Sequence, residues 1–553
     1  MIRSDSKRWP TISHSFLLRF LLVVLFSTWI ISNILHPAQD PDLWWHLASG
    51  RYIVMHRVIP TIDVFSWTAK GSPWVNSYWL YDTVLFWVFS RLAIAGVVIG
   101  HALLALLVFF LMAYRLHQKH VFWAVTTGAL SLFFLLGAPS GYWPQASLVS
   151  IFFTSALLLL LDRWLEDPST NTYWIGPLLF AVWANMHRGF LIGLLMASAY
   201  ALVIFLQEKK RSLPILWVLL CILATLLTPY GAKLYTMMWT DMTLSSQLIM
   251  GWATPRFTDH PVLLGIVFLF WLTHLYDRWQ RRAIPWPLVI LAGVLTAGAL
   301  RSIVFIPYFL LMAIPFLAQH VSRWMEAITK RYGFEKYDFG LGLLIGGLLL
   351  ASLARAHPAL GVQTLSFPVK AFDFIRTEKV TGAFYNDYAF GGYWMWAFGE
   401  DLPVFIDGRY PAVQGYISLV PEIQTAQRSP KAWKAFLDRY AINAALLKYY
   451  PDTPFPSLFE AIFPSSRWAL VYWDDAGVLF LRRGAKNRAV IQAREFRVIR
   501  PDMKPEFFSR MLRETSPARR KDIRQELLRN LRLIPESRRT QRFLTFFEDS
   551  TTL

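Results

Sequence analysis

The most regular feature of the sequence is a series of long apolar runs between residues 16 and 355. A helix needs about 20 predominantly apolar residues to cross the roughly 30 Å hydrocarbon core of a bilayer. The runs therefore predict a polytopic α-helical membrane protein with about eleven spans, at residues 16–35, 96–113, 121–137, 145–161, 173–187, 190–206, 213–228, 261–276, 284–300, 303–319 and 338–354.

One further apolar stretch, residues 78–91, is left out of that count. It contains Asp82 and ends in Arg91, which is typical of an amphipathic helix lying in the membrane interface. The choice matters because an additional crossing would reverse the side on which every later loop lies.

Lys and Arg residues give the spans an orientation, because cytoplasmic loops carry an excess of them. The N-terminus before the first span and the loops at 115–120, 162–171, 207–212, 277–283 and 319–338 are richer in these residues than the loops on the other side. No small-residue cleavage site follows residues 16–35, so they are predicted to be a retained span and not a removed signal peptide. We expect a bacterial inner (cytoplasmic) membrane protein with its N-terminus in the cytoplasm and its C-terminal domain periplasmic or extracellular.

The chain after residue 355 has the mixed composition of a soluble domain. Apolar stretches at 382–386, 402–407, 443–449 and 468–473 predict short buried strands, and residues 431–441 have helical spacing. The sequence thus predicts three parts: a membrane domain at 1–355 whose first outer loop is 36–95, an extracytoplasmic α/β domain at 356–484, and a basic helical tail at 485–553. The amphipathic stretch 522–534 in that tail indicates either a solvated helical face or a surface that docks on anionic headgroups.

Composition narrows the function classes. Hydrophobic residues make up 55% of the chain and charged residues only 16%, where a soluble protein carries about 25% charged residues. The net charge of +19 is explained by loop arginines and anionic lipid, so the bilayer and not nucleic acid is the predicted partner. The single Cys221 excludes an internal disulfide. The sequence contains no phosphate-binding P-loop, HExxH, GxSxG or zinc-type Cys/His spacing, which disfavours nucleotide-driven transport and zinc-dependent hydrolysis.

A cluster of polar and aromatic residues directly follows the first span. Its members are Asp40, Asp42, Trp44, Trp45 and His46. Carboxylates at a membrane boundary cost free energy unless they face water or a partner, so this loop is a candidate for chemistry. The alternative is that Asp40 caps a helix containing residues 42–55 and that the Trp pair belongs to the interfacial aromatic belt.

Cations occur on the same predicted side, where topology does not explain them. His187 and Arg188 lie in a tight turn, Arg301 lies between two spans, and Arg256 lies in a longer outer loop. Guanidinium groups suit phosphate oxygens because their donors form a planar fork, so the set indicates a site for a lipid-linked phosphate. A structural salt-bridge network joining Asp40 and Asp42 to Arg188 and Arg301 is the alternative.

Several blocks of sequence together resemble the GT-C glycosyltransferases, and most closely a bacterial branch with a DPDLWWH block. The blocks lie at 40–80, 183–190, 226–231, 300–307, 385–396 and 404–410, and the resemblance extends over about residues 15–450. It implies a GT-C-like fold and an enzyme that takes a sugar from a polyprenyl-phosphate carrier.

The resemblance also implies residue roles. Asp40 or Asp42 would be the general base, and the same two carboxylates could hold a divalent metal such as Mg²⁺ or Mn²⁺. The lipid phosphate would be bound by Arg301, with support from His46, His187, Arg188 and Arg256. The candidates for the acceptor side are Trp44, Trp45, Asp63, Trp79, Asp387, Asp407 and Arg409. Turn chemistry is the alternative for the last three.

The resulting functional hypothesis is a membrane glycosyltransferase that moves a hexosyl or pentosyl group from a polyprenyl-phosphate-linked donor to an envelope glycan, lipid or protein on the extracytoplasmic side. The alternative hypothesis is a non-enzymatic membrane protein that binds, translocates or scaffolds an envelope lipid or polysaccharide.

Overall fold

The computed structural model folds into two compact units. Unit 1 contains residues 1–38 and 77–361, and unit 2 contains residues 39–76 and 362–553. The structure describes residues 14–35, 37–137, 145–167, 174–207, 212–244, 255, 258, 260–282, 285–332, 335–353, 359–362, 367–449, 462–501, 503 and 505–551. The compact units do not follow the linear order of the chain, because the first predicted outer loop is divided and residues 39–76 cluster with the C-terminal part.

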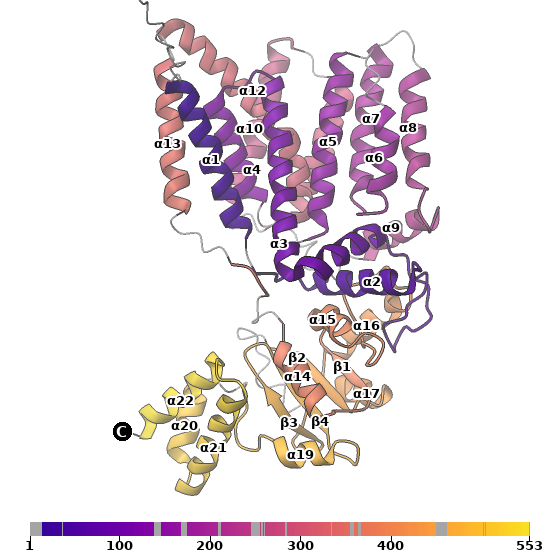
Figure 1. Cartoon of the computed structure of the whole chain (residues 1–553), viewed down its shortest axis with the longest axis vertical. Helices are drawn as coiled ribbons and strands as arrows, with labels where there is room; N and C mark the ends of the chain where they lie inside the picture. The colour runs from indigo at the N-terminus through magenta and orange to yellow at the C-terminus, as the bar shows by residue number, and fades with distance from the viewer. Residues whose placement is uncertain are drawn as a thin grey trace, which may run out of the picture. The chain divides into compact units, whose positions relative to one another are not determined.

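Unit 1 is helical (Figure 1). Its α-helices are α1 His14–Ile34, α3 Trp79–Gln118, α4 Trp123–Gly137, α5 Ser147–Glu166, α6 Ile175–Trp183, α7 Phe190–Gln207, α8 Ser212–Thr225, α9 Lys233–Leu244, α10 Pro261–Trp279, α11 Trp286–Arg301, α12 Ile306–Tyr332 and α13 Glu335–Leu353, with a 3₁₀ turn η5 at Ile303–Phe305. Each segment predicted to span the membrane coincides with one of these helices. Among the residues that the structure describes, five helices are long and apolar enough to cross a bilayer, and α1, α4, α8, α11 and α13 contain shorter apolar stretches. The protein is therefore a multi-pass membrane protein, while the total of eleven spans remains a prediction.

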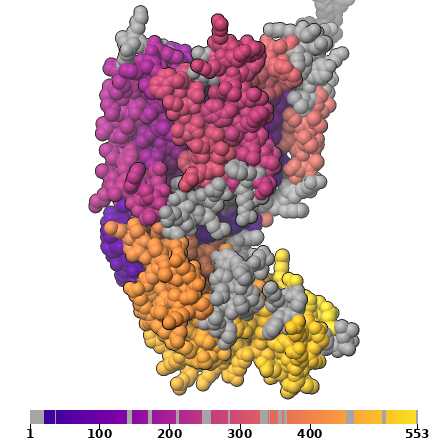
Figure 2. All heavy atoms as spheres, turned by 180° about the vertical axis from the view of Figure 1, so that it is seen from behind, coloured from indigo at the N-terminus to yellow at the C-terminus, as the bar shows by residue number. Residues whose placement is uncertain are grey.

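The outer surface of unit 1 is apolar where α10 lies. Helices α10 and α11 lie in the middle of the upper part of the face seen in Figure 2. Large apolar side chains of α10 are exposed there, namely Val262, Phe268, Leu269 and Leu272. Exposed apolar side chains of this kind suit a lipid environment, because lipid chains are as apolar as they are.

Helix α3 consists of two segments that fold back at Ala93. Ala93 has φ 51° and ψ −156°, which is not helical. Tyr81 Oη lies 3.1 Å from His101 Nε2 across the bend. A straight helix would separate residues twenty positions apart by about 30 Å, so the two segments form a sharp bend. The segment before Ala93 matches the stretch predicted as a separate amphipathic helix, and its interfacial location remains a prediction.

The chain passes from unit 1 to unit 2 after Ala38 and again after Gly361, and these two points are neighbours. Ala38 N–H donates to Gly361 O, and Ala359 N–H donates to Leu35 O, both at 2.8 Å. Helices α1 and α13 pack together, and the Trp29 indole donates to Ser352 Oγ at 2.8 Å. The segment with Asp40 therefore begins beside the segment that leads to the C-terminal domain.

Unit 2 is built on a small mixed sheet. Its strands are β1 Phe384–Asn386, β2 Ala444–Lys448, β3 Trp468–Trp473 and β4 Gly477–Arg482, in the order β1-β2-β4-β3. β1 pairs with β2 in parallel, and the other pairs are antiparallel. The predicted strands at 382–386, 443–449 and 468–473 are confirmed, and β4 was not predicted.

The predicted strand at 402–407 is wrong. Backbone groups of this segment are bonded to the Asn386 side chain and not to a neighbouring strand. Asn386 accepts from Phe405 N–H and donates to Ile406 O, both at 2.8 Å. Val404 forms a single bridge with Ser66. The segment is apolar because it is buried against the 61–75 loop of unit 2, not because it joins the sheet.

The helices of unit 2 surround the sheet and form the tail. They are α2 Asp42–His56, α14 Val369–Thr377, α15 Tyr388–Phe398, α16 Tyr416–Ala426, α17 Pro430–Arg439, α19 Arg488–Arg494, α20 Pro505–Glu514, α21 Pro517–Leu533 and α22 Arg538–Thr551. The predicted helix at 431–441 corresponds to α17, and the amphipathic stretch 522–534 lies in α21. The tail helices belong to the same compact unit as the sheet.

Candidate functional site

The Asp40–Asp42 pair lies at the N-terminus of α2. Asp40 Oδ1 accepts a hydrogen bond of 3.0 Å from the Asp42 backbone N–H. Asp40 is thus bonded to the first residue of α2, while Pro41 holds the N-cap position. The alternative interpretation, in which Asp40 caps the helix, is met only in this bond. Burial and the nearby Asp42 carboxylate raise the pKa of Asp40 well above its usual range, and the bond from Asp42 N–H opposes this rise only in part. Asp40 thus combines a hydrogen bond to the start of α2 with an unusually high proton affinity.

Two glycines of the C-terminal domain make room for this helix terminus. A Cβ atom on Gly408 would lie 2.1 Å from Asp42 Oδ1, and a Cβ atom on Gly392 would lie 2.4 Å from Pro41 O. Only glycine permits so close an approach. The blocks at 385–396 and 404–410 therefore contact the DPDLWWH block directly, although more than 340 positions separate them.

The aromatic residues of the block are buried in unit 2. Trp44 is 3% exposed and packs edge-on against Tyr393, with ring centroids 4.7 Å apart. Trp45 is also buried, and its ring lies 3.6 Å from that of His46. The Trp pair is consequently part of a packed core and not of an exposed aromatic belt.

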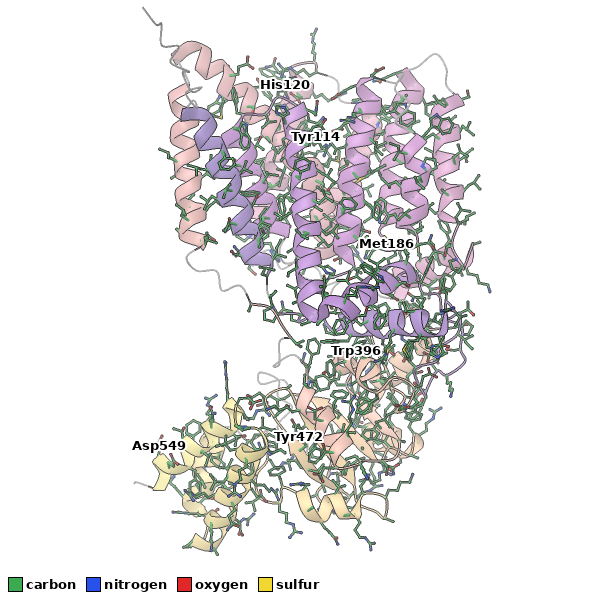
Figure 3. All side chains as sticks on the ribbon, viewed as in Figure 1. Tyr114, His120, Met186, Trp396, Tyr472 and Asp549 are labelled. Atoms are coloured by element: carbon green, nitrogen blue, oxygen red, sulfur yellow. The ribbon has the colours of Figure 1, made fainter. Side chains whose placement is uncertain are left out.

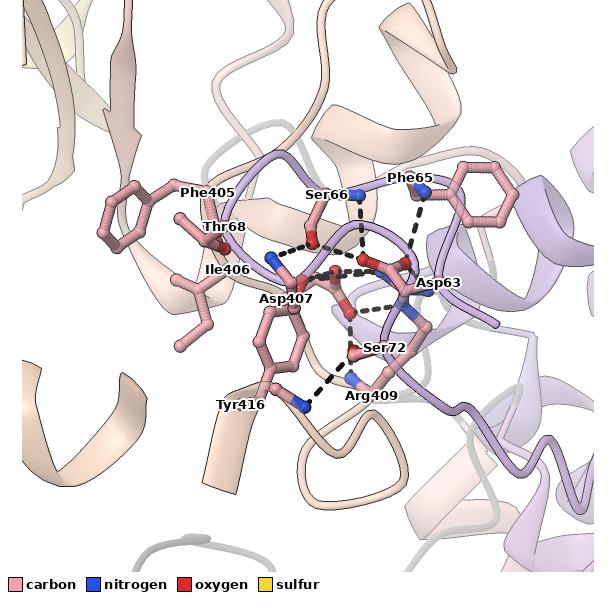
Figure 4. Close-up of polar contacts among 12 residues, drawn as sticks. Asp63, Phe65, Ser66, Thr68, Ser72, Phe405, Ile406, Asp407, Arg409 and Tyr416 are labelled. Atoms are coloured by element: carbon pink, nitrogen blue, oxygen red, sulfur yellow. Dashed lines mark hydrogen bonds and ion pairs between the residues drawn. The ribbon is translucent and has the colours of Figure 1, made fainter. Parts of the chain in front are cut away.

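Three of the predicted acceptor-side residues form one buried ion network (Figure 4). The guanidinium of Arg409 contacts Asp63 Oδ1 at 2.6 Å and Asp407 Oδ2 at 2.7 Å, and all three side chains are 0% exposed or nearly so. Tyr416 Oη donates to Asp407 Oδ2 at 2.6 Å. Arg409 also lies over the Trp74 ring at 4.6 Å. This network ties residues 63–74 to residues 407–416.

Asp387 lies at a helix terminus of its own. Its Oδ1 accepts from Ala389 N–H at 3.0 Å and caps α15, and burial raises its pKa. This geometry is the turn chemistry that was the alternative for Asp387.

In unit 1, three of the sequence blocks meet around Asn185. Its Oδ1 accepts from Trp79 Nε1 at 2.6 Å, its backbone O accepts from Leu80 N–H at 3.1 Å, and its Nδ2 donates to Leu227 O at 2.8 Å. The neighbouring Met186 and the distant His120 lie at opposite ends of the helices of unit 1 (Figure 3). The blocks at 40–80, 183–190 and 226–231 therefore supply a common turn region at one end of unit 1.

His187 is held by hydrogen bonds to one ring nitrogen. Its Nδ1 accepts from Gly189 N–H at 2.9 Å and lies 2.6 Å from Ser150 Oγ. The ring packs edge-on against Tyr78 at 5.4 Å. Because Nδ1 accepts, the proton of the neutral ring is on Nε2. His187 can therefore present an Nε2–H donor in a fixed orientation.

The cations of unit 1 differ in their surroundings. Arg188 forms an ion pair with Asp241, a buried residue of α9, and its guanidinium lies 5.5 Å from the Tyr78 ring centroid. Arg301 is exposed at the end of α11, and no carboxylate among the described residues pairs with it. Arg256 lies outside the described residues.

The residues Asp241, Ser150 and Gly408 were not predicted, because short-range patterns carry no signal for partners that are distant in sequence.

A divalent metal would find few ligands in the part of the chain that the structure describes. No group of three or more His, Cys, Asp or Glu side chains gathers there. Asp40 and Asp42 supply two carboxylates, which suits the way Mg²⁺ binds through one or two carboxylates together with substrate phosphates. The residues fit a metal that arrives with its substrate better than a closed metal site.

Comparisons with known proteins support the fold. No protein-family model and no curated protein matches the chain. The oligosaccharyltransferase AglB from Archaeoglobus fulgidus matches with a TM-score of 0.50 and 11% identity over 81% of this chain and 71% of that chain. The same figures hold for its complex with an inhibitory peptide and a dolichol-phosphate. ArnT from Cupriavidus metallidurans bound to undecaprenyl phosphate matches with a TM-score of 0.46 and 12% identity, over 86% of this chain and 99% of that chain. At this identity the similarity concerns the fold alone, and the fold that the resemblance implied is confirmed.

Proposed function

We propose that the chain is a membrane glycosyltransferase that moves a sugar from a polyprenyl-phosphate-linked donor to an envelope acceptor on the extracytoplasmic side. The observation that carries the proposal is the Asp40–Asp42 pair at the start of α2, in which burial and the second carboxylate raise the pKa of Asp40. A complex of AglB, whose fold is similar, contains a dolichol-phosphate, which supports a lipid carrier as the donor class.

The acidic pair fits the role of general base. An acceptor hydroxyl would donate its proton to one carboxylate while its oxygen attacks the anomeric carbon of the donor sugar. The bond from that carbon to the phosphate oxygen breaks, and the electron pair remains on the phosphate. A raised pKa makes a carboxylate a stronger base, and general base catalysis contributes about 10²–10⁴ in rate.

We assign the carrier phosphate to the cations of unit 1. Arg301 has no carboxylate partner among the described residues, so its fork of donors is available to phosphate oxygens. The fixed Nε2–H of His187 could donate a further hydrogen bond to an anion. Arg188 is paired with Asp241, and its proposed role is to hold the turn that orients His187.

Where a divalent ion binds, Asp40 and Asp42 would be its ligands from the protein, and the ion would neutralise charge on the phosphate.

The proposal is tested by sugar transfer with the full chain in lipid nanodiscs. A panel of radiolabelled polyprenyl-phosphate sugars is incubated with a membrane acceptor fraction, and labelled product and free carrier phosphate are both measured. Asp42→Asn and Asp40→Asn should lower transfer by about 10²–10⁴ while the carrier still binds. Asp373→Asn is the matched control, because this exposed carboxylate of unit 2 lies outside the pair.

Two results would overturn the proposal. Transfer at the wild-type rate by both Asp40→Asn and Asp42→Asn would exclude the pair as the base. Tight carrier binding without transfer from any donor would favour the alternative of a protein that binds or translocates an envelope lipid. Arg301→Gln should raise the donor KM more than it lowers kcat, which separates phosphate binding from proton transfer.

A further inference from the structure

A second cluster of cations lies in unit 2, far along the chain from the acidic pair. A cleft of about 300 Å³ is bordered by the end of α19, by β3 and by the end of α21. It is lined by Val471, Arg494, Phe496, Arg529, Arg532 and Leu533. Half of these residues are arginines and the others are apolar, so the cleft combines three guanidinium groups with an apolar wall.

Hydrogen bonds hold one of the arginines in place. Arg529 Nη2 donates to Glu495 O at 2.8 Å and to Arg494 O at 3.2 Å. Its guanidinium lies over the Phe496 ring, 4.4 Å from the centroid. The side chain is therefore positioned before any ligand binds, and this lowers the entropic cost of binding.

The carboxylates near the cleft already form ion pairs or hydrogen bonds. Arg494 contacts Glu378 Oε1 through Nη2 at 2.8 Å. The two oxygens of Glu526 accept backbone N–H groups of residues 497–499, at distances between 2.7 and 3.3 Å. Glu495 forms ion pairs with Arg483 and Arg497 outside the lining.

The cleft consequently carries surplus positive charge. The lining together with its charged neighbours contains five arginines, 483, 494, 497, 529 and 532, and three glutamates, 378, 495 and 526, which leaves two positive charges more than negative ones. Arg532 has no ion-pair partner among the described residues. Burial lowers the pKa of Arg529, and the charges of Arg494 and Arg497 lower it further against the effect of Glu526. Arginine remains charged under such conditions, so a bound anion would add to the stabilisation that Glu526 already gives Arg529.

We propose that this cleft binds a phosphate monoester carried on a sugar or lipid headgroup. A monoester carries close to two negative charges at neutral pH and matches the surplus, whereas a single carboxylate would neutralise half of it. The forked donors of arginine suit phosphate oxygens. The apolar residues Val471, Phe496 and Leu533 offer a surface for the carbon skeleton of the attached group, and the volume is within the range of small-ligand sites. This binding site does not depend on the proposed transfer reaction.

The test uses the full chain in detergent and measures the dissociation constant of a soluble sugar phosphate by isothermal titration calorimetry. Arg532→Gln should weaken binding about tenfold or more, because it removes a charge-assisted bond without breaking a contact within the described structure. Arg524→Gln is the matched control: it is an exposed arginine of the same helix outside the cleft lining, and it should leave the constant unchanged.

A second experiment distinguishes the two sources of the phosphate. Nanodisc-embedded protein is titrated with short-chain phosphatidic acid, which has a monoester headgroup, and with short-chain phosphatidylglycerol, which has a diester headgroup. Tighter binding of phosphatidic acid than of the sugar phosphate, lost in Arg532→Gln, would identify a lipid-borne monoester, and the reverse order would identify a soluble one. Equal binding of monoester and diester, or equal weakening by Arg532→Gln and Arg524→Gln, would overturn the proposal because it would indicate general electrostatic attraction only.

Discussion

Asp63 and Arg409 lie 346 positions apart and form an ion pair of 2.6 Å in which neither side chain is exposed. The first belongs to the segment that follows α2, and the second belongs to the Asp-Gly-Arg turn before α16. Arg409 is further bonded to Asp407. The association of residues 39–76 with the C-terminal domain therefore depends on a charged network in the core of unit 2.

We expect Arg409→Met to destabilise unit 2 by about 3–5 kcal/mol, because it leaves two buried carboxylates without their cation. Asp63→Asn should have a smaller effect, since Asp407 still neutralises Arg409. Thermal unfolding in detergent measures both. Arg439→Gln is the matched control, because its ion pair with Glu422 is 70% exposed on the arginine side and such pairs contribute about 0–1 kcal/mol. An equal loss of stability in Arg409→Met and Arg439→Gln would contradict the structural role of the network.

Gly408→Ala should disturb the acidic pair directly. The added Cβ would lie 2.1 Å from Asp42 Oδ1, so the carboxylate or the turn must move. We expect a stability loss of about 1–3 kcal/mol from overpacking and a fall in sugar transfer of about 10², since small displacements of reacting groups are costly. Gly484→Ala, at an exposed glycine with open space around its Cβ position, should change neither. Normal transfer by Gly408→Ala would show that the position of Asp42 is not critical.

The long apolar helices of unit 1 could be predicted from the sequence because each apolar run carries its own signal over about 20 residues, whereas α9, at Lys233–Leu244, was not predicted. The partner of Arg188 could not, because Asp241 lies 53 positions away and no local pattern links the two. The same limit explains why residues 402–407 were mistaken for a strand. Burial makes any segment apolar, and only the contact with residues 61–75 shows that the segment lies outside the sheet.

In the candidate site, too, some residues could be predicted from the sequence and others could not. Asp40 and Asp42 could be identified from two carboxylates after a span, and the capping alternative was also visible in that pattern. The roles of Gly392 and Gly408 required the fold, because a glycine needed for close approach looks like any turn glycine in the sequence. The acidic character of Asp63 and Asp407 suggested chemistry, whereas their common bond to Arg409 gives both a structural role.

The bend in α3 should depend on Gly96. Gly96 lies three residues after the non-helical Ala93. A Cβ atom on Gly96 would lie 2.2 Å from Leu92 Cβ. We expect Gly96→Ala to lower the unfolding temperature in detergent and to cost about 1–3 kcal/mol. Gly100→Ala, four residues further along the same helix with nothing within 4 Å of its Cβ position, should be neutral or slightly stabilising, since alanine favours helices. If both variants unfold at the wild-type temperature, the bend does not require the missing side chain.

The raised pKa of Asp40 predicts that this residue reduces stability at neutral pH. Its folded-state pKa lies above the unfolded value of about 3.9. The folded state therefore binds the proton more tightly, and stability falls as pH rises from the unfolded pKa through the folded one. Asp40→Asn keeps an oxygen that can accept from Asp42 N–H but carries no charge. It should raise the unfolding temperature at pH 7, and the gain should shrink as the pH approaches 4.

The same variant should lose sugar transfer, as expected where an active-site group is held at a cost in stability. The unfolding temperatures of wild type, Asp40→Asn and the exposed control Asp373→Asn are compared at both pH values. A gain in Asp40→Asn that is absent at pH 7, or equal at pH 7 and pH 4, would show that the carboxylate is not destabilised in the folded protein.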